Sequence, residues 1–174
     1  RIPWQLLLMI NATFTGMIIT SFEDALAVQV ALTAFIPMLM DTGGNSGSQS
    51  SVTVIRALSL GDVEFSDILK VIWKEFRVSI MVGCTLAVAN FGKIMLVDVL
   101  LMGNTSVTVP VAAVVCMTLV VTVVCAEFVG CTLPILAKRV GFDPAVMASP
   151  FITTIVDAIS LMVYFGFAKF MLGV

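Results

Sequence analysis

Three carboxylates stand out in this sequence because they lie inside otherwise apolar stretches. Asp41, Glu127 and Asp157 each fall within a run long enough to cross a bilayer. A charged side chain near the bilayer centre costs about 2.5–3.5 kcal/mol on insertion scales, so such residues usually face a cavity, a partner or a mobile cation. No lysine or arginine lies at a similar depth in these runs. We therefore expect the three acids either to be protonated or to meet a cation.

Asp157 offers the clearest chemistry of the three. At a helical rise of about 1.5 Å per residue it lies roughly 18 Å into the last apolar run, close to the middle of the membrane. Thr153, Thr154 and Ser160 are three or four residues away and share its helix face. Together with carbonyls freed near Ser149-Pro150, this face offers only oxygen, which suits a hard cation such as Mg²⁺. The other interpretation is a protonated aspartic acid that hydrogen-bonds to a neighbouring helix.

A glycine-rich polar stretch, residues 41–49, interrupts the second apolar run. Glycine lets a helix unwind, and a helix that breaks at membrane depth exposes carbonyl oxygens that can line a cation path. We expect Asp41, Gly44 and Asn45 to contribute to such a path. The alternative is that the glycines form a hinge or allow close packing between helices.

Glu127 has no single interpretation. It lies about ten residues before the basic pair Lys138-Arg139, which ends the fourth apolar run. It could be a pore residue, a proton-coupling site, or a hydrogen-bond partner of Asn90 or Thr122.

The composition excludes several classes of function. Hydrophobic residues make up 60% of the chain and charged residues only 11%, too few for the surface of a soluble domain. The absence of histidine excludes imidazole metal sites and Ser–His nucleophile pairs. The four cysteines lie in apolar stretches without CxxC spacing and are interpreted as structural. A net charge of −2 without a basic patch excludes nucleic acid as a partner.

The apolar runs predict an all-α integral membrane protein with five transmembrane helices. The expected spans are approximately residues 4–22, 25–58, 78–101, 109–137 and 145–172. The second span is expected to be broken near mid-membrane by its glycine-rich stretch. Residues 61–77 place apolar and charged side chains on opposite helix faces, which predicts an amphipathic surface helix before the third span. Asp143-Pro144 is typical of an N-cap followed by the first helical position.

The basic residues predict the orientation in a cell membrane. With a cytosolic N-terminus and five spans, the C-terminus is external and seven of the nine cations lie inside, as the positive-inside rule requires. The inner set is Arg1, Arg56, Lys70, Lys74, Arg77, Lys138 and Arg139; the outer set is Lys93 and Lys169.

Two stretches of the sequence resemble the transmembrane domain of the MgtE family of magnesium channels and transporters. The first comprises Pro37-Met38-Leu39, Gly43-Gly44-Asn45-Ser46-Gly47-Ser48-Gln49-Ser50 and Arg56-Ala57-Leu58. The second comprises Leu133-Pro134, Lys138-Arg139, Gly141, Asp143-Pro144-Ala145, Ser149-Pro150, Thr153-Thr154 and Asp157. With the five spans, the resemblance covers nearly the whole chain.

The resemblance implies a homodimer in the lipid bilayer, with an ion path along the two-fold axis lined by the second and fifth helices. It implies that Asp157 holds a largely hydrated Mg²⁺, to which Thr153 contributes through its backbone. We expect Mn²⁺, Co²⁺ or Ca²⁺ to be possible occupants of the same site. Family members carry cytosolic sensor domains ahead of this one, so residues 1–174 are expected to be a single pore domain within a longer protein.

The sequence thus predicts a magnesium transporter with a channel-like homodimeric pore, and not an enzyme. The alternative is a proton- or sodium-coupled divalent metal carrier that uses Glu127 or Asp41 for coupling. An aspartyl protease with Asp41 and Asp157 as its dyad is disfavoured, because the motifs that surround such aspartates are missing. A simple membrane anchor would need neither Asp157 nor the glycine-rich stretch.

Overall fold

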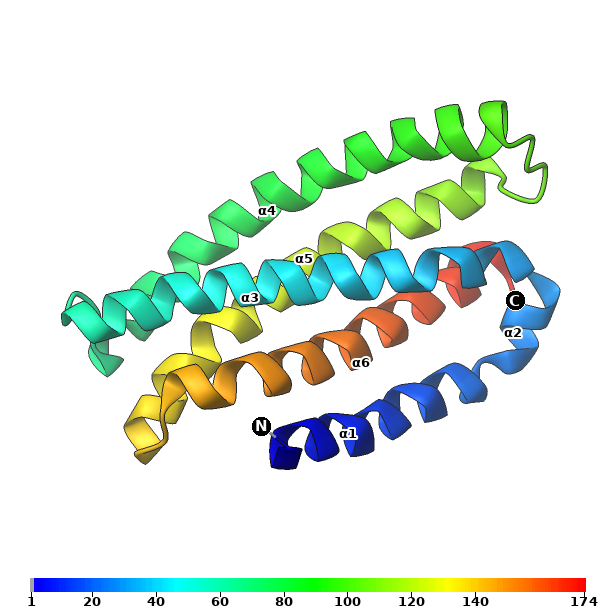
Figure 1. Ribbon diagram of the computed structural model, residues 1–174. Coiled ribbons are helices and arrows are strands. Elements are labelled where there is room, and N and C mark those ends of the chain that lie inside the picture. Colours follow the sequence, from blue (N-terminus) through cyan, green and yellow to red (C-terminus); the bar gives the residue numbers. More distant parts are fainter. Residues whose placement is uncertain (1) are drawn as a thin grey trace.

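The computed structural model describes residues 2–174, apart from the side chains of residues 147–149. Every regular element in this part of the chain is a helix (Figure 1). In chain order the elements are α1 (Ile2–Ser21), α2 (Glu23–Val28), η1 (Val30–Phe35), α3 (Ile36–Leu60), η2 (Phe65–Asp67), α4 (Ile68–Lys93), η3 (Ile94–Leu101), α5 (Val109–Val140) and α6 (Pro144–Leu172). The short elements η1 and η2 are 3₁₀-helices, and η3 is a π-helix that continues α4. The all-α prediction is confirmed.

Four segments of the described chain are long and apolar enough to cross a membrane. They are Ile2–Ser21, Phe65–Leu101, Val109–Val140 and Pro150–Leu172. The fifth long helix, α3, has 25 residues, enough for a hydrocarbon core of about 30 Å, but its polar residues lower its hydropathy. Length and composition therefore support four of the five expected spans.

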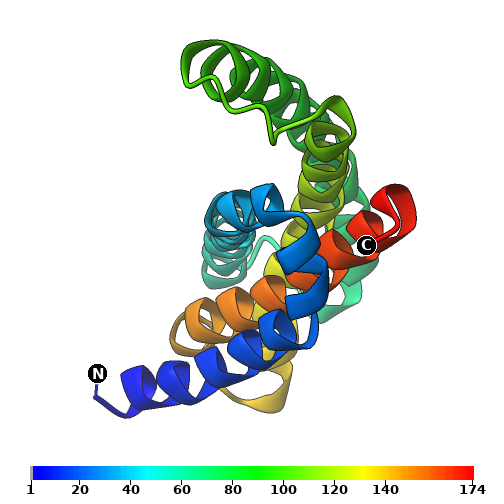
Figure 2. The ribbon, with the colours of Figure 1, turned by 90° about the vertical axis from the view of Figure 1, so that its right-hand side faces the viewer.

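The helix α5 is the centre of the bundle. It packs against α3, α4 and α6, and Val111, Val115, Leu119 and Val123 on it are almost completely buried. By contrast, α1 has no buried residue and contacts the bundle mainly through α6. Figure 2 shows α1 and α4 at opposite margins of the bundle. A helix that is apolar and exposed on almost all sides, as α1 is, suits contact with lipid.

The predicted break in the second span is wrong. The helix α3 is continuous from Ile36 to Leu60 and includes the whole glycine-rich stretch. The run is interrupted earlier, where α2 ends and the 3₁₀-helix η1 leads into α3. There the hydroxyl of Tyr164 in α6 donates a hydrogen bond of 2.7 Å to the carbonyl of Leu32, and both residues are fully buried. A backbone carbonyl of this irregular segment thus has a hydrogen-bond partner within the protein. Non-helical backbone inside a membrane needs such partners because no water is available there.

The glycines of α3 are used for helix packing, which was the alternative interpretation. A Cβ atom at Gly43 would lie 2.7 Å from side-chain atoms of both Thr122 in α5 and Val156 in α6. A Cβ atom at Gly130 of α5 would overlap the backbone carbonyl of Gly47. Small residues let helix backbones approach closely. The α3 backbone stays helical through the glycines because its N–H and C=O groups then bond to one another.

The amphipathic segment is not a separate surface helix, so this prediction is also corrected. The helix α4 continues from Ile68 to Lys93 without interruption, since no proline falls within it. Ile68 and Ile72 pack against a small core formed by α3 and α5, whereas Trp73 is exposed. The segment is the first part of the third long helix.

The predicted start of the last helix is confirmed. The carboxylate of Asp143 accepts a hydrogen bond of 3.0 Å from the backbone N–H of Ala145, and Pro144 occupies the first turn of α6. This cap satisfies one of the backbone donors that every helix N-terminus leaves unpaired.

Gly130→Ala tests the close approach of α5 to α3. The added methyl group meets a backbone carbonyl, which cannot move aside as a flexible side chain can, so the helices must separate. We expect the free energy of unfolding to fall by about 1–3 kcal/mol. The measurement is the melting temperature of the purified protein in detergent.

The matched control is Gly92→Ala on α4, where a Cβ atom would have no other atom within 4 Å. This change should leave the melting temperature unchanged or raise it slightly, because alanine is the better helix former. Equal melting temperatures for the two variants would contradict the packing described for Gly130.

Candidate cation site

The helices α3 and α6 form an open groove that contains every residue expected at the cation site. Its volume is about 500 Å³. The lining residues are Ile36, Pro37, Met40, Asp41, Gly44, Asn45 and Ser48 from α3, and Thr153 and Asp157 from α6. The structure therefore brings Asp41, Gly44, Asn45, Thr153 and Asp157 to one place, although more than 100 residues separate the two groups in the sequence.

The α3 wall of the groove is built by helical spacing. Asp41, Gly44, Asn45 and Ser48 are three or four residues apart and share one face. The Asn45 amide donates a hydrogen bond of 3.2 Å to Asp41 Oδ2, which holds the two side chains together. A Cβ atom at Gly44 would lie 3.6 Å from Thr153, so the two walls are in close reach there. Because α3 stays helical, its carbonyls bond within the helix, and α3 offers the groove its side chains instead.

The hydroxyl groups near Asp157 bond mainly to their own helix. Thr153 and Thr154 both donate to the carbonyl of Pro150, at 3.1 and 2.9 Å. Ser160 is buried and donates to a carbonyl one turn earlier in α6, at 2.6 Å. Of the three hydroxyl residues expected beside Asp157, only Thr153 lines the groove.

The groove carries two carboxylates without a basic neighbour. Two ion pairs occur in the described part of the chain, and neither involves Asp41 or Asp157. The described residues also contain no cluster of three acidic, cysteine or histidine ligands. The carbonyls expected to be freed near Ser149-Pro150 belong to α6, which continues through Pro150, and the side chain of Ser149 lies outside the described residues. Two carboxylates can attract a cation and hold its water shell, but they are too few to replace that shell.

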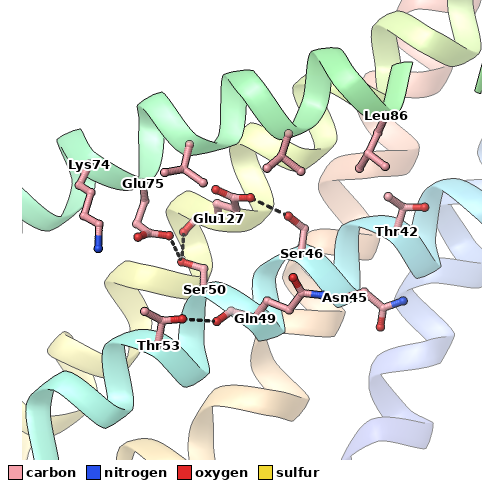
Figure 3. Close-up of a pocket in the computed structure, with 12 residues that line it drawn as sticks. Thr42, Asn45, Ser46, Gln49, Ser50, Thr53, Lys74, Glu75, Leu86 and Glu127 are labelled. Carbon is pink, nitrogen blue, oxygen red and sulfur yellow. Dashed lines mark hydrogen bonds between the residues drawn. The ribbon is translucent and has the colours of Figure 1, made fainter. Parts of the chain in front are cut away.

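A second cavity lies on another face of α3, between α3, α4 and α5 (Figure 3). Its volume is about 470 Å³, and Glu127 of α5 lines it. The partner of Glu127 is neither Asn90 nor Thr122 but Ser46, whose hydroxyl donates to Oε1 at 3.0 Å. Glu127 is therefore not part of the groove that contains Asp157.

Glu75 is the residue that sequence reasoning missed. It was placed on the polar face of a surface helix, yet it is only 8% exposed and accepts a hydrogen bond of 2.9 Å from Ser50. A signal was present in the spacing. Glu75, Ser79 and Gly83 recur every four residues, so small or polar side chains mark the one buried face of α4.

The sequence was compared with known protein families and curated proteins. Residues 36–167 match the model of the MgtE family, described as a divalent cation transporter. The chain is 38% identical over 168 residues to the magnesium transporter MgtE of Bacillus subtilis (strain 168), with 97% of this chain and 36% of that protein covered. It is 34% identical over 172 residues to the magnesium transporter MgtE of Thermus thermophilus, with 99% and 36% covered.

A third relative agrees with these two. The chain is 29% identical over 169 residues to the magnesium transporter MgtE of Enterococcus faecalis, with coverages of 97% and 36%. The chain thus spans about a third of the length of these curated relatives. The family match includes all of α3, α4 and α5 and most of α6, and it confirms the resemblance found in the sequence. The family is one of transporters and not of enzymes. This chain belongs to the MgtE family of divalent cation transporters.

Proposed function

We propose that this chain forms the membrane path of a magnesium transporter, with Asp157 as the main cation ligand. The observation that supports this most directly is the single groove lined by Asp41, Gly44, Asn45, Thr153 and Asp157. The three relatives are each named a magnesium transporter. We extend magnesium transport, the activity named for these relatives, to residues 1–174.

The ligand chemistry of the groove suits a hydrated Mg²⁺. This ion prefers oxygen, gives up its water reluctantly, and is usually bound through one or two carboxylates. In the proposal, Asp157 accepts hydrogen bonds from the water shell while Asn45 and the Thr153 backbone help to position it. Such a path is channel-like, because the ion is never stripped. Mn²⁺, Co²⁺ and Ca²⁺ share the preference for oxygen and would compete for the same position.

The proposal includes a two-fold homodimer. One Asp157 under-compensates a divalent ion, whereas two symmetry-related copies supply two negative charges at one site. Gly166 on α6 supports this arrangement, because no other atom lies within 4 Å of its Cβ position. A glycine that packs against nothing in its own chain leaves room for a helix of a second copy to approach.

In the proposed topology α3 is the remaining membrane span and the N-terminus is cytosolic. The basic residues expected inside lie where α3 ends, α4 begins and α5 ends, and Figure 1 shows these three helix ends on one side of the bundle. Two of these basic residues connect the helix ends to one another. Lys138 donates a hydrogen bond of 3.1 Å to the Leu58 carbonyl, and the Arg139 guanidinium lies 3.8 Å from the centre of the Phe65 ring. Arg1 lies outside the described residues. The positive-inside rule assigns this side to the cytosol.

Asp157→Asn tests the proposed ligand. The change keeps the size and hydrogen-bonding capacity of the side chain but removes its charge. We expect Mg²⁺ uptake into liposomes that carry the purified protein to fall at least about tenfold, which corresponds to about 1.4 kcal/mol of lost attraction. A protonated structural aspartic acid would instead tolerate asparagine with little loss.

Asp24→Asn is the matched control, because Asp24 is exposed and lines neither cavity. Its uptake should equal that of the unchanged protein. Uptake is measured without an imposed proton or sodium gradient, so that neither gradient drives the Mg²⁺ uptake that is compared. Mg²⁺ uptake by Asp157→Asn equal to that of the unchanged protein would contradict the proposed role of this residue.

The dimer is tested by light scattering in mild detergent. We expect a mass of two chains, and we expect Gly166→Leu to shift the protein toward a single chain because the added bulk blocks helix approach. Gly16→Leu on α1 is the control, since its Cβ position is equally free of contacts within the chain. A transport-active single chain would rule out the shared axis.

The topology is tested by cysteine labelling in intact cells. In a background that lacks the four native cysteines, Met102→Cys and Val140→Cys place thiols at positions that are 70% and 71% exposed. A membrane-impermeant maleimide should label residue 102 from outside, and residue 140 only after permeabilisation. The reverse pattern would overturn the cytosolic N-terminus.

A further inference from the structure

The second cavity brings together two buried carboxylates from different helices. Glu75 comes from α4 and is 8% exposed, and Glu127 comes from α5 and is 6% exposed. The two are linked through Ser50 of α3, whose hydroxyl lies 2.9 Å from Glu75 Oε2 and 3.3 Å from the Glu127 backbone carbonyl. Figure 3 shows both carboxylates beside α3, on the side where Ser46 and Ser50 point toward them.

One buried carboxylate oxygen among the described residues that line this cavity has no hydrogen-bond partner. Ser46 donates to Glu127 Oε1, but Oε2 of the same carboxylate is buried and has no hydrogen-bond partner in the described structure. Lys74 also lines the cavity, yet it is an exposed residue and forms no ion pair with either acid. Glu75, Glu127 and Lys74 are the charged residues among those that line the cavity. Glu75 and Glu127 therefore have no ion-pair partner in the described part of the chain.

We propose that this cavity binds a hard divalent cation between Glu75 and Glu127, at a site separate from Asp157. The donors are two carboxylates and two serine hydroxyls, so every ligand is an oxygen, as Mg²⁺, Mn²⁺ and Ca²⁺ prefer. The serine protons point to carboxylate oxygens, which leaves the hydroxyl lone pairs available to the ion. A cation gives Glu127 Oε2 the partner that it lacks, and it neutralises two acids whose charges burial would otherwise penalise.

A proton fits the same geometry less well. A proton on Oε2 of Glu127 would leave this buried oxygen without a partner among the described residues, and a proton on Oε1 would replace the hydrogen bond that Ser46 donates there. The site lies on a different face of α3 from the groove, and Asn45 is the one residue that lines both.

The test counts Mn²⁺ ions bound to the purified protein by equilibrium dialysis at neutral pH. It uses the Asp157→Asn variant as the parent, so that the proposed groove site is already removed. This parent should still bind Mn²⁺, and Mg²⁺ should compete for it. Adding Glu127→Gln should weaken the remaining binding at least about tenfold, because one of the two carboxylate ligands is lost.

Glu75→Gln in the same parent should have a similar effect. It also serves as the second variant in case the more central Glu127→Gln does not fold, which helical circular dichroism and the elution profile would reveal. Asp24→Asn in the same parent is the control, and its Mn²⁺ binding should be unchanged. Together these variants separate a specific ligand from a general loss of negative charge.

The outcomes are distinct from those that test Asp157. If Asp157 is not a ligand, Asp157→Asn will bind as many Mn²⁺ ions as the unchanged protein, and Glu127→Gln will still remove one class of them. If folded Glu127→Gln and Glu75→Gln bind Mn²⁺ as tightly as their parent, the second site is overturned. Unchanged Mn²⁺ binding with an altered pH dependence of uptake would overturn it as well, and would assign the cavity to a proton.

Discussion

The close approach of α3 to α5 and α6 determines where the other features of the bundle lie. Gly43 and Gly47 occupy the contact, and Gly130 of α5 lies against the backbone of Gly47. With this face fixed, helical geometry turns the two remaining polar faces of α3 outward from the contact. One face forms the groove with α6, and the other forms the cavity with α4 and α5. A larger side chain at the contact would push α3 away from α5 and α6, and would so displace one wall of the groove and one wall of the cavity.

Polar groups in this apolar bundle are satisfied in two ways. Thr153 and Thr154 bond to a carbonyl of their own helix, which leaves Asp157 without a competing partner from these hydroxyls. Ser46 and Tyr164 instead bond across helices, and so tie α3 to α5 and η1 to α6. Because an unpaired polar group in hydrocarbon is costly, the cross-helix bonds fix the register of the helices. In the groove, neither Asp41 nor Asp157 forms an ion pair with a described residue.

Features with a local cause could be predicted from the sequence. The start of α6 follows from Asp143-Pro144, and the two acids of the groove, Asp41 and Asp157, stand out because acids inside apolar runs are rare and costly. The break in α3 was predicted wrongly, because glycine favours unwinding only where packing does not hold the helix together. The spacing of Glu75, Ser79 and Gly83 marks a buried face of α4, but the environment of Glu75 could not be read from its own segment. It depends on Ser50 and Glu127, which lie far away in the sequence.

The continuity of α3 has a mechanical consequence. A helix of 25 residues without an interruption moves as one rigid rod, so its two polar faces cannot shift independently. The helix α3 forms a wall of both the groove and the cavity, and Asn45 lines both. With the other helices held in place, a displacement of α3 changes a wall of the groove and a wall of the cavity at the same time. The shapes of the groove and the cavity are therefore coupled through the position of α3.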